Sequence, residues 1–311
     1  MKRINIFSSV LFALLFALVQ LYPSKCLGEN IAVVTSIFPV ADMVRAVGEE
    51  HVDVTFILPA GASPHTFEPK PSLVKKITRA RIFFMIGAGL EFWAEKFVKL
   101  AGPGLETVVL SEKVSLIHTT GDHHKAEKHD GKPDISDRKS SFANPHIWLD
   151  PVIVKLMVNE IVAALSKVDR QHEKFYKQQG RKYLGELDKL DRMIKAKVDV
   201  FKIKEFVSFH ASWDYFARRY GLEPVGVIES APGRNPTPIQ IKNIVDQIKR
   251  HNIQAVFAEP QLNPRAAEVI AKEAKVKVLL LDPLGGPGMK RRSNYIDLMQ
   301  YNLNVLQEAM Q

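Results

Sequence analysis

Three of the ten histidines lie where the chain is expected to pass between a strand and a loop or between a loop and a helix. His65 follows the β-rich run VTFILP, His210 ends the run FVSFH, and His146 shortly precedes a predicted helix. Asp150 as N-cap and Pro151 at the first helical position mark the start of that helix. Imidazole nitrogens are borderline-soft ligands that suit zinc and are also compatible with manganese or ferrous iron.

Asp282 has a comparable position, because it ends the run VKVLLLD and precedes Pro283. In open parallel sheets, ligands bind beyond the carboxyl ends of the strands. Three imidazoles and one carboxylate would make a four-ligand zinc site. However, a single loop histidine is usually solvated or hydrogen-bonded, and an aspartate before a proline is a common turn former. Spacing alone does not decide between these interpretations, so the fold must bring the four residues together.

The elements that must position these residues follow a βαβ rhythm. With 311 residues, 46% of them hydrophobic, the chain is long enough for two globular domains. Short β-rich runs alternate with helical patterns between 30 and 150, and the rhythm returns after residue 205. The pattern predicts an α/β protein with two lobes, 29–167 and 205–311, each with a mainly parallel sheet flanked by helices. A single long rigid helix over 168–204 is expected to join them.

The connecting helix is predicted from its apolar periodicity. One face carries side chains spaced three, four and seven residues apart: Tyr176, Tyr183, Leu187, Leu190, Ile194 and Phe201. The many lysines between them then form the solvated face of the helix, and we do not expect a nucleic-acid interface. Gly180 and Gly185 each weaken a helix by up to about 1 kcal/mol, so packing against the lobes must hold it.

The first 28 residues have the pattern of a secretory signal peptide. A basic head precedes an apolar stretch over 4–21, and a polar region ends at Gly28, after which we predict cleavage. A lipid anchor on Cys26, the only cysteine, is the rival interpretation, but residues 23–25 are not the small or aliphatic ones that it needs. No later run reaches the ~18 apolar residues of a membrane span, so we expect the mature chain to be exported and soluble.

Residues 118–143 stand apart from both predicted lobes. This segment has very few aromatic or aliphatic side chains, which cannot repay the entropy of ordering it, so we predict a mobile loop. The loop carries His118, His123, His124 and His129. These histidines are either a metal-collecting element or part of a solvated insertion.

Four ordered motifs behind the signal peptide carry a resemblance. GASPHTFEP (61–69), NPHIWLDP (144–151), FHASWDYFARRYGL (209–222) and LLLDPLGG (279–286) resemble the metal-binding solute receptors of bacterial zinc and manganese ABC importers. The resemblance extends from about residue 31 to the C-terminus. It implies two α/β lobes joined by one long rigid helix, with the metal held in the cleft between the lobes.

Carried over by position, the resemblance makes His65 and His146 ligands from the first lobe and His210 and Asp282 ligands from the second. A histidine in the third place resembles the zinc receptors, whereas manganese receptors tend to carry a carboxylate there. Zinc is therefore the expected metal, with manganese or iron as the alternative. Zinc receptors also often carry a histidine-rich loop before the second ligand, which is where segment 118–143 lies.

Three other residues bear on this match. Asn144 stands where an acid is common in the family, which affects a hydrogen bond behind a ligand. Glu229 and Glu259 also end second-lobe strands. Each is an alternative carboxylate ligand, although hydrogen-bond support of an imidazole is the role that we expect.

The resemblance further implies a monomeric receptor, not an enzyme, that delivers captured zinc to a membrane permease. The chain contains no Walker phosphate loop, so a separate ATPase must supply the energy for transport. An exported zinc-dependent hydrolase is the alternative from another class, since three protein ligands and one water form a catalytic site. No HExxH motif occurs, and Asp282 would fill the fourth position. A surface adhesin with an incidental metal lacks support from repeats or a stalk.

Overall fold

The computed structural model describes residues 30–120, 141–230 and 234–311. The predicted signal peptide, its cleavage point after Gly28 and the rival lipid site Cys26 lie outside the described residues, as do His123, His124 and His129. Ile31–Gln311 forms one compact unit. Across the described ranges, no helix combines the length and the apolar character needed to cross a membrane.

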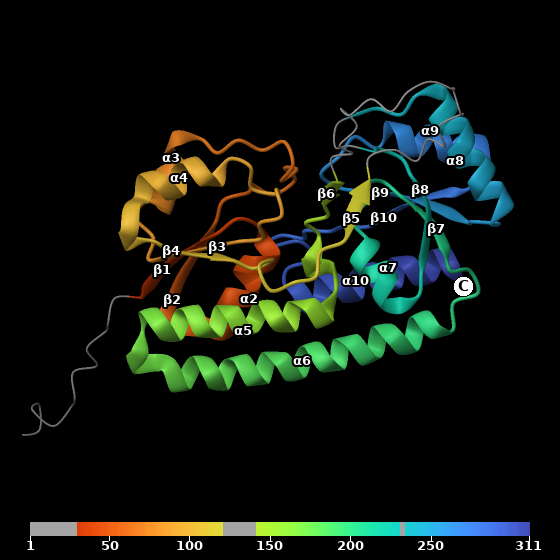
Figure 1. Ribbon diagram of the computed structural model, residues 1–311. Helices are drawn as coiled ribbons and strands as arrows, with labels where there is room; N and C mark the ends of the chain where they lie inside the picture. Colours follow the sequence, from red (N-terminus) through yellow and green to blue (C-terminus); the bar gives the residue numbers. More distant parts are fainter. Residues whose placement is uncertain (1–29, 121–140, 231–233) are drawn as a thin grey trace, which may run out of the picture. The chain divides into compact units, whose positions relative to one another are not determined.

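The first lobe is built on a parallel sheet with the strand order β2-β1-β3-β4 (Figure 1). Strands β1 and β3 are almost wholly buried, as expected for central strands covered on both faces. Val33 and Phe84 face the core shared with α2 and α5, whereas Val34 and Phe83 face the core shared with α3 and α4. The elements are β1 (Ile31–Thr35), α2 (Phe38–Gly48), β2 (Val52–Phe56), α3 (Pro71–Ile77), β3 (Ile82–Met85), α4 (Ala94–Ala101), β4 (Glu106–Val109) and α5 (Pro151–Val168).

The second lobe repeats this construction with a parallel sheet in the order β10-β9-β7-β8. Val207 and Val256 pack in the core that α8 and α9 cover, and Phe206 and Phe257 pack on the other face, with α7 and α10. The elements are β7 (Glu205–Ser208), α7 (Asp214–Tyr220), β8 (Glu223–Val227), α8 (Pro238–Arg250), β9 (Ala255–Ala258), α9 (Arg265–Ala274), β10 (Lys277–Leu280) and α10 (Tyr295–Met310). The predicted α/β class with two mainly parallel sheets is therefore confirmed.

A long helix, α6 (Glu173–Asp199), links the two lobes and lies beside α5 (Figure 1). The helix is shorter at both ends than the predicted 168–204. Five of the six side chains predicted for its apolar face lie on it and are buried, and the sixth, Phe201, is buried just beyond its end. Burying one such side chain contributes about 1.5–3 kcal/mol, which offsets the weak helix propensity of its glycines. Gly180 is needed for the close approach of the helices, because a Cβ there would lie 2.5 Å from a methyl group of Val162 on α5.

The loop predicted over 118–143 is wrong at both of its ends. Strands β5 (His118–Thr120) and β6 (Ser141–Ala143) pair in antiparallel fashion, with His118 opposite Ala143. The N–H of Asn144 extends this ribbon by donating to the carbonyl of Ile117 at 2.7 Å. The prediction of a mobile loop came from the small number of apolar side chains, but backbone hydrogen bonds hold such a ribbon without an apolar core of its own.

Candidate metal centre

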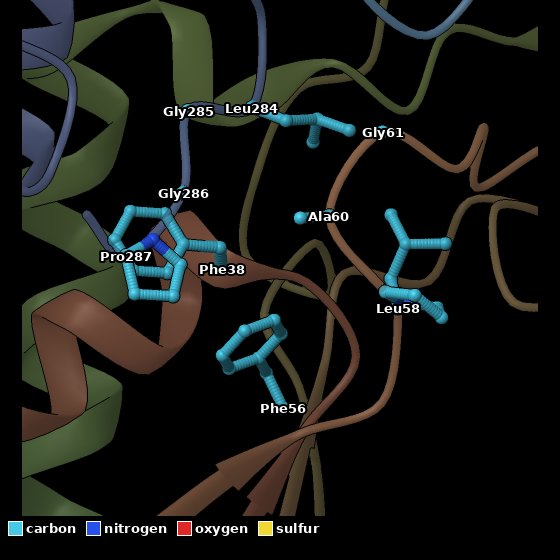
Figure 2. A pocket seen from close by; sticks show the side chains of 10 residues that line it. Phe38, Phe56, Leu58, Ala60, Gly61, Leu284, Gly285, Gly286 and Pro287 are labelled. Carbon is cyan, nitrogen blue, oxygen red and sulfur yellow. The ribbon is translucent and has the colours of Figure 1, made fainter. Parts of the chain in front are cut away.

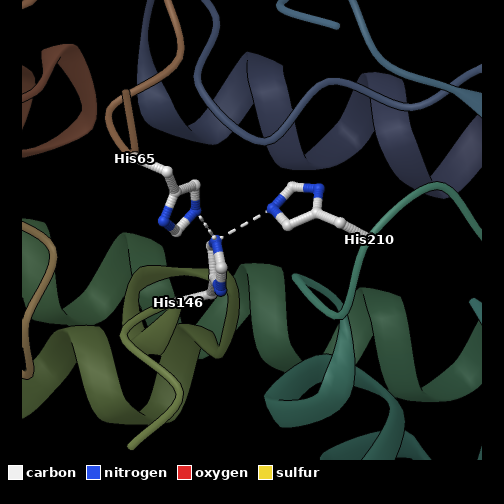
Figure 3. Close-up of side chains that lie close together, drawn as sticks. All are labelled: His65, His146 and His210. Carbon is white, nitrogen blue, oxygen red and sulfur yellow. Dashed lines mark hydrogen bonds between the residues drawn. The ribbon is translucent and has the colours of Figure 1, made fainter. Parts of the chain in front are cut away.

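Three loops from the two lobes bring His65, His146 and His210 together (Figure 3). His65 lies in the loop after β2, and His210 lies two residues after β7, so both follow the carboxyl end of a parallel strand, as predicted. His146 directly precedes the short 3-10 helix Ile147–Leu149, which leads into α5.

Asp150 is the N-cap of α5, as its position before Pro151 predicted. Its Oδ1 accepts a hydrogen bond from the N–H of Val152 at 2.8 Å. The Nε–H of Arg219 on α7 donates to Oδ2 of the same carboxylate at 2.9 Å. Asp150 therefore fixes the start of α5, and with it the loop of His146, against an element of the second lobe.

The ligand atoms of the three histidines converge. Nε2 of His146 lies 3.1 Å from Nε2 of His65 and 3.0 Å from Nε2 of His210. Among the described residues, these three form the group of potential metal ligands whose atoms all lie within 4.8 Å of one another. Tetrahedral zinc, with Zn–N bonds of about 2.0–2.1 Å, holds its nitrogens roughly 3.3 Å apart. Both nitrogen–nitrogen distances at His146 lie within a few tenths of an ångström of that value.

Hydrogen bonds behind two of the rings determine which nitrogen faces the centre. Nδ1 of His146 lies 2.7 Å from Oδ1 of Asn144, and Nδ1 of His210 lies 2.8 Å from Oε1 of Glu259. Both oxygens accept, so each Nδ1 carries a proton and each Nε2 presents its lone pair. Two lone pairs at 3.0 Å repel each other unless a proton or a metal ion lies between them.

The surroundings of His65 and His146 disfavour a proton in that place. Burial, and then the charge of neighbouring His210, lowers the pKa of His65 to about 4. Burial, and then the charges of His210 and His65, lowers the pKa of His146 well below its ordinary value. At neutral pH these two rings are neutral imidazoles, which is the form that coordinates metal ions.

Asn144 joins the loop of His146 to the second lobe. Its Oδ1 also accepts from the backbone N–H of His146 at 3.0 Å, and its Nδ2 donates to the carbonyl of Ala211 at 2.7 Å and to Oδ2 of Asp214 at 3.0 Å. The hydroxyl of Tyr215 donates to the carbonyl of Asn144 at 2.8 Å. A carboxylate could accept from His146 but could not donate to the other two groups, so an amide fits this position.

The structure does not bring all the predicted site residues together. Asp282 lies two residues after the end of β10, near the strand end at which it was expected. It lies outside the converging group, and its carboxylate is hydrogen-bonded to other residues. Glu259 supports His210 from behind, which is the role that the sequence suggested for it. Glu229 is buried in the second lobe, and His118 is exposed in β5.

Two hollows adjoin at this place. One is lined by the three histidines together with Ser63, Pro64, Trp148, Glu259, Gln261, Leu262, Pro283 and Leu284. The other shares Leu284 with it and is lined by apolar side chains and backbone, including Phe38 and Phe56 (Figure 2). Only the first hollow offers metal ligands. Sequence reasoning had no signal for Trp148, whose Nε1–H donates to the carbonyl of Pro283 at 2.7 Å and so closes the wall beside His146.

Comparison with known proteins shows which family the chain matches. Residues 33–309 match the family described as zinc-uptake complex component A, periplasmic. The high-affinity zinc uptake system protein ZnuA of Bacillus subtilis is 25% identical over 287 residues, which cover 91% of this chain and 88% of ZnuA. The zinc-binding protein AdcA of Streptococcus pyogenes is 28% identical over 323 residues, which cover 98% of this chain but only 61% of AdcA.

Solved structures agree with this result. A crystal structure of ZnuA has a TM-score of 0.78 at 25% identity and covers 90% of this chain and 99% of its own. The laminin-binding protein Lmb of Streptococcus agalactiae, described as bifunctional with adhesin and metal transporting activity, has a TM-score of 0.78 at 28% identity. It covers 91% of this chain and 100% of its own.

Proposed function

The chain belongs to the family of periplasmic zinc-uptake complex components, and from this premise we propose that it captures zinc outside the cytoplasmic membrane for an ABC importer. His65, His146 and His210 are the zinc ligands in this proposal. Asn144 and Glu259 hold two of the rings with Nε2 toward the ion. A membrane permease receives the zinc, and a separate ATPase drives its import.

The observation that carries this proposal is the convergence of three imidazole edges from two lobes. A buried cluster of neutral rings with opposed lone pairs costs folding free energy, and a divalent cation relieves that cost. Because the ligands come from both lobes, the bound ion also ties the lobes together. Such a site suits reversible capture and release.

The ligand set favours zinc over manganese or iron. Nitrogen ligands suit zinc, whereas manganese prefers carboxylate, carbonyl and water oxygens. The relatives from Bacillus subtilis and Streptococcus pyogenes are likewise named for zinc. A hydrolytic zinc site would also leave a coordination position for water, but the family consists of substrate-binding components, so capture is the function that we propose.

The proposal places the protein in the periplasm as a monomer, after removal of residues 1–28. A related AdcA of Streptococcus pneumoniae is described as a zinc-binding lipoprotein. Cleavage after Gly28 would remove Cys26, and no lipid anchor would then remain on this chain. Intact-mass spectrometry of the exported protein distinguishes a chain that begins at Glu29 from one that is lipidated at Cys26.

The test of the function is the metal content of protein purified from the periplasm without added metal, combined with competition titrations. We expect one tightly bound zinc per chain in the wild type and none in the triple variant of His65, His146 and His210 to alanine. Manganese or iron as the dominant metal, or tight zinc binding by the triple variant, would overturn the proposal.

A further inference from the structure

The carboxylate of Asp282 is buried and accepts hydrogen bonds from four donors. Its Oδ2 pairs with Nη1 of Arg292 at 2.7 Å. Its Oδ1 accepts from Nε2 of Gln261 at 2.9 Å and from the backbone N–H groups of Leu284 and Gly285, both at 3.0 Å. Turning this carboxylate toward another cation would break hydrogen bonds that it already makes, one of them to a charged donor.

Asp282 nevertheless stands next to the metal centre. The two residues that follow it, Pro283 and Leu284, line the hollow beside the three histidines, and so does Gln261. Asn302 on α10 holds the backbone of Asp282 through two hydrogen bonds. The N–H of Asp282 donates to Oδ1 of Asn302 at 2.8 Å, and the carbonyl of Asp282 accepts from Nδ2 of Asn302 at 2.7 Å. The backbone of Asp282 is therefore anchored to α10, and its side chain is bound to residues at the edge of the site.

Arg292 is itself held in position. Its guanidinium lies over the ring of Tyr301, 4.9 Å from the centroid, and its carbonyl accepts from the N–H of Gly286 at 3.1 Å. Gly285 makes this loop possible: it has φ +62°, and a Cβ there would lie 2.6 Å from the carbonyl oxygen of Arg292. The loop after β10 thus folds back and places one cation against the carboxylate.

We propose that Arg292 and Gln261 hold the carboxylate of Asp282 out of the metal's coordination sphere and so set the ion preference of the site. The inference rests on the proposed function, which it deepens. With Asp282 withheld, the chain offers the ion three nitrogens, which favours zinc. With Asp282 released, a hard oxygen ligand with a negative charge becomes available, which improves the site for manganese.

The physical reason is the cost of an unpaired buried charge. Without Arg292, the carboxylate of Asp282 would remain buried without its cation, and such a group gains most from the nearest alternative cation. The divalent ion in the adjoining hollow is that cation. Arg292 is thus a positioning residue, since it acts on the metal only through Asp282.

The test uses Arg292→Gln in the full-length exported protein, with zinc and manganese affinities measured by competition titration. We expect the released carboxylate to strengthen manganese binding about tenfold more than it strengthens zinc binding, so that the preference for zinc falls by about tenfold. Arg292→Lys keeps the charge and should retain most of the wild-type preference. X-ray absorption of the bound ion should show an added oxygen ligand in Arg292→Gln only.

The double variant Arg292→Gln/Asp282→Asn is the decisive control, because the gain in manganese affinity must disappear with the carboxylate. Gln261→Ala gives a second route that retains Arg292 and should shift the preference in the same direction by a smaller factor. Thermal melting verifies that each variant is folded.

The outcomes separate this proposal from the proposed function. If the wild type binds zinc tightly but Arg292→Gln and Gln261→Ala keep the wild-type preference, Asp282 is not withheld from the site and only this proposal fails. The same holds if an Asp282 oxygen already coordinates zinc in the wild type. If the wild type binds no zinc tightly, the proposed function itself fails.

Discussion

Two groups of histidine rings in contact occur in the described part of the chain, and their geometries are opposite. His65, His146 and His210 meet edge to edge through Nε2. His51 and His172 instead stack face to face, with ring centroids 3.8 Å apart and an angle of 20° between the planes. Nδ1 of His172 lies 2.6 Å from Oδ2 of Asp169, so this pair also has a carboxylate behind one ring.

The difference shows that neither proximity nor a supporting carboxylate makes a metal centre. The lone pair of an imidazole nitrogen lies in the plane of its ring, so stacked rings direct their lone pairs along parallel lines that do not meet at one ion. In the converging group, the rings are tilted by 53° and 67° about His146, which lets their edges share one point. Ring orientation, set by the loops and the residues behind them, distinguishes the two groups.

The largest effect expected from this comparison is the loss of a converging ring. A structural zinc site contributes about 10–16 kcal/mol over four ligands, or about 2.5–4 kcal/mol for each, so His146→Ala should weaken zinc binding by about a hundredfold to a thousandfold. His172→Ala, the matched change in the stacked pair, should alter it by less than about threefold. Competition with a chromogenic chelator measures both. Equal losses in the two variants would mean that ring convergence does not define the site.

A pH titration tests the burial of the converging rings. The unfolded chain protonates His65 near pH 6.5, whereas its pKa in the folded protein is about 4. Between these values the unfolded state binds more protons, so the free energy of unfolding falls as the pH falls. The difference is worth on the order of 3 kcal/mol, and His146 acts in the same direction.

The measurement is denaturant unfolding of the metal-free protein at pH 7.5 and 4.5, for the wild type and for His65→Gln. The amide cannot take up a proton, so the variant should lose about 2–3 kcal/mol less than the wild type over this interval. Subtracting the two proteins removes the contributions of the other titrating groups. Parallel pH curves would show that His65 is not buried as described.

A smaller effect is expected from the carboxylates behind the rings. Glu259→Gln keeps the size of the side chain but removes the charge that orients His210, so zinc affinity should fall by about tenfold. Asp169→Asn is the equivalent change behind His172 and should leave zinc affinity unchanged. If both variants bind zinc like the wild type, the loops alone orient the histidine rings.

Local sequence signals for the ends of strands and helices explain why the three histidines could be found without a structure. Strand ends and the Asp150–Pro151 helix start are local signals, and each histidine lies in a loop that follows such a strand end or precedes this helix start. The sheet topology then brings strand ends to the same edge, although only the fold could show that two lobes share one site. Asn144 was recognisable as a departure from the family pattern, but its donor bonds to Ala211 and Asp214 were not.

Side-chain direction could not be predicted, as Asp282 illustrates. Its place after a strand end was correct, yet its carboxylate is bound to Arg292, and Asn302 on α10 clamps its backbone. Neither partner belongs to a local pattern that includes Asp282. The same limit applies to His51 and His172, which are 121 positions apart and whose stacking no periodicity could reveal.

The smallest effect concerns the polar segment that precedes the second ligand. Replacing residues 121–140 by a short turn keeps β5 and β6, whose pairing leads directly to Asn144 and His146. The tight zinc site should therefore bind within about threefold of the wild type, because a change beyond the ribbon leaves the rings and their supports in place. Any binding that His123, His124 and His129 contribute is lost, so the number of zinc ions bound in excess metal should fall toward one.

Removing β5 and β6 as well should weaken the tight site more, since Asn144 then loses the bond to Ile117. Loss of tight binding on deletion of 121–140 alone would assign the site to the polar segment and overturn the role of the converging rings.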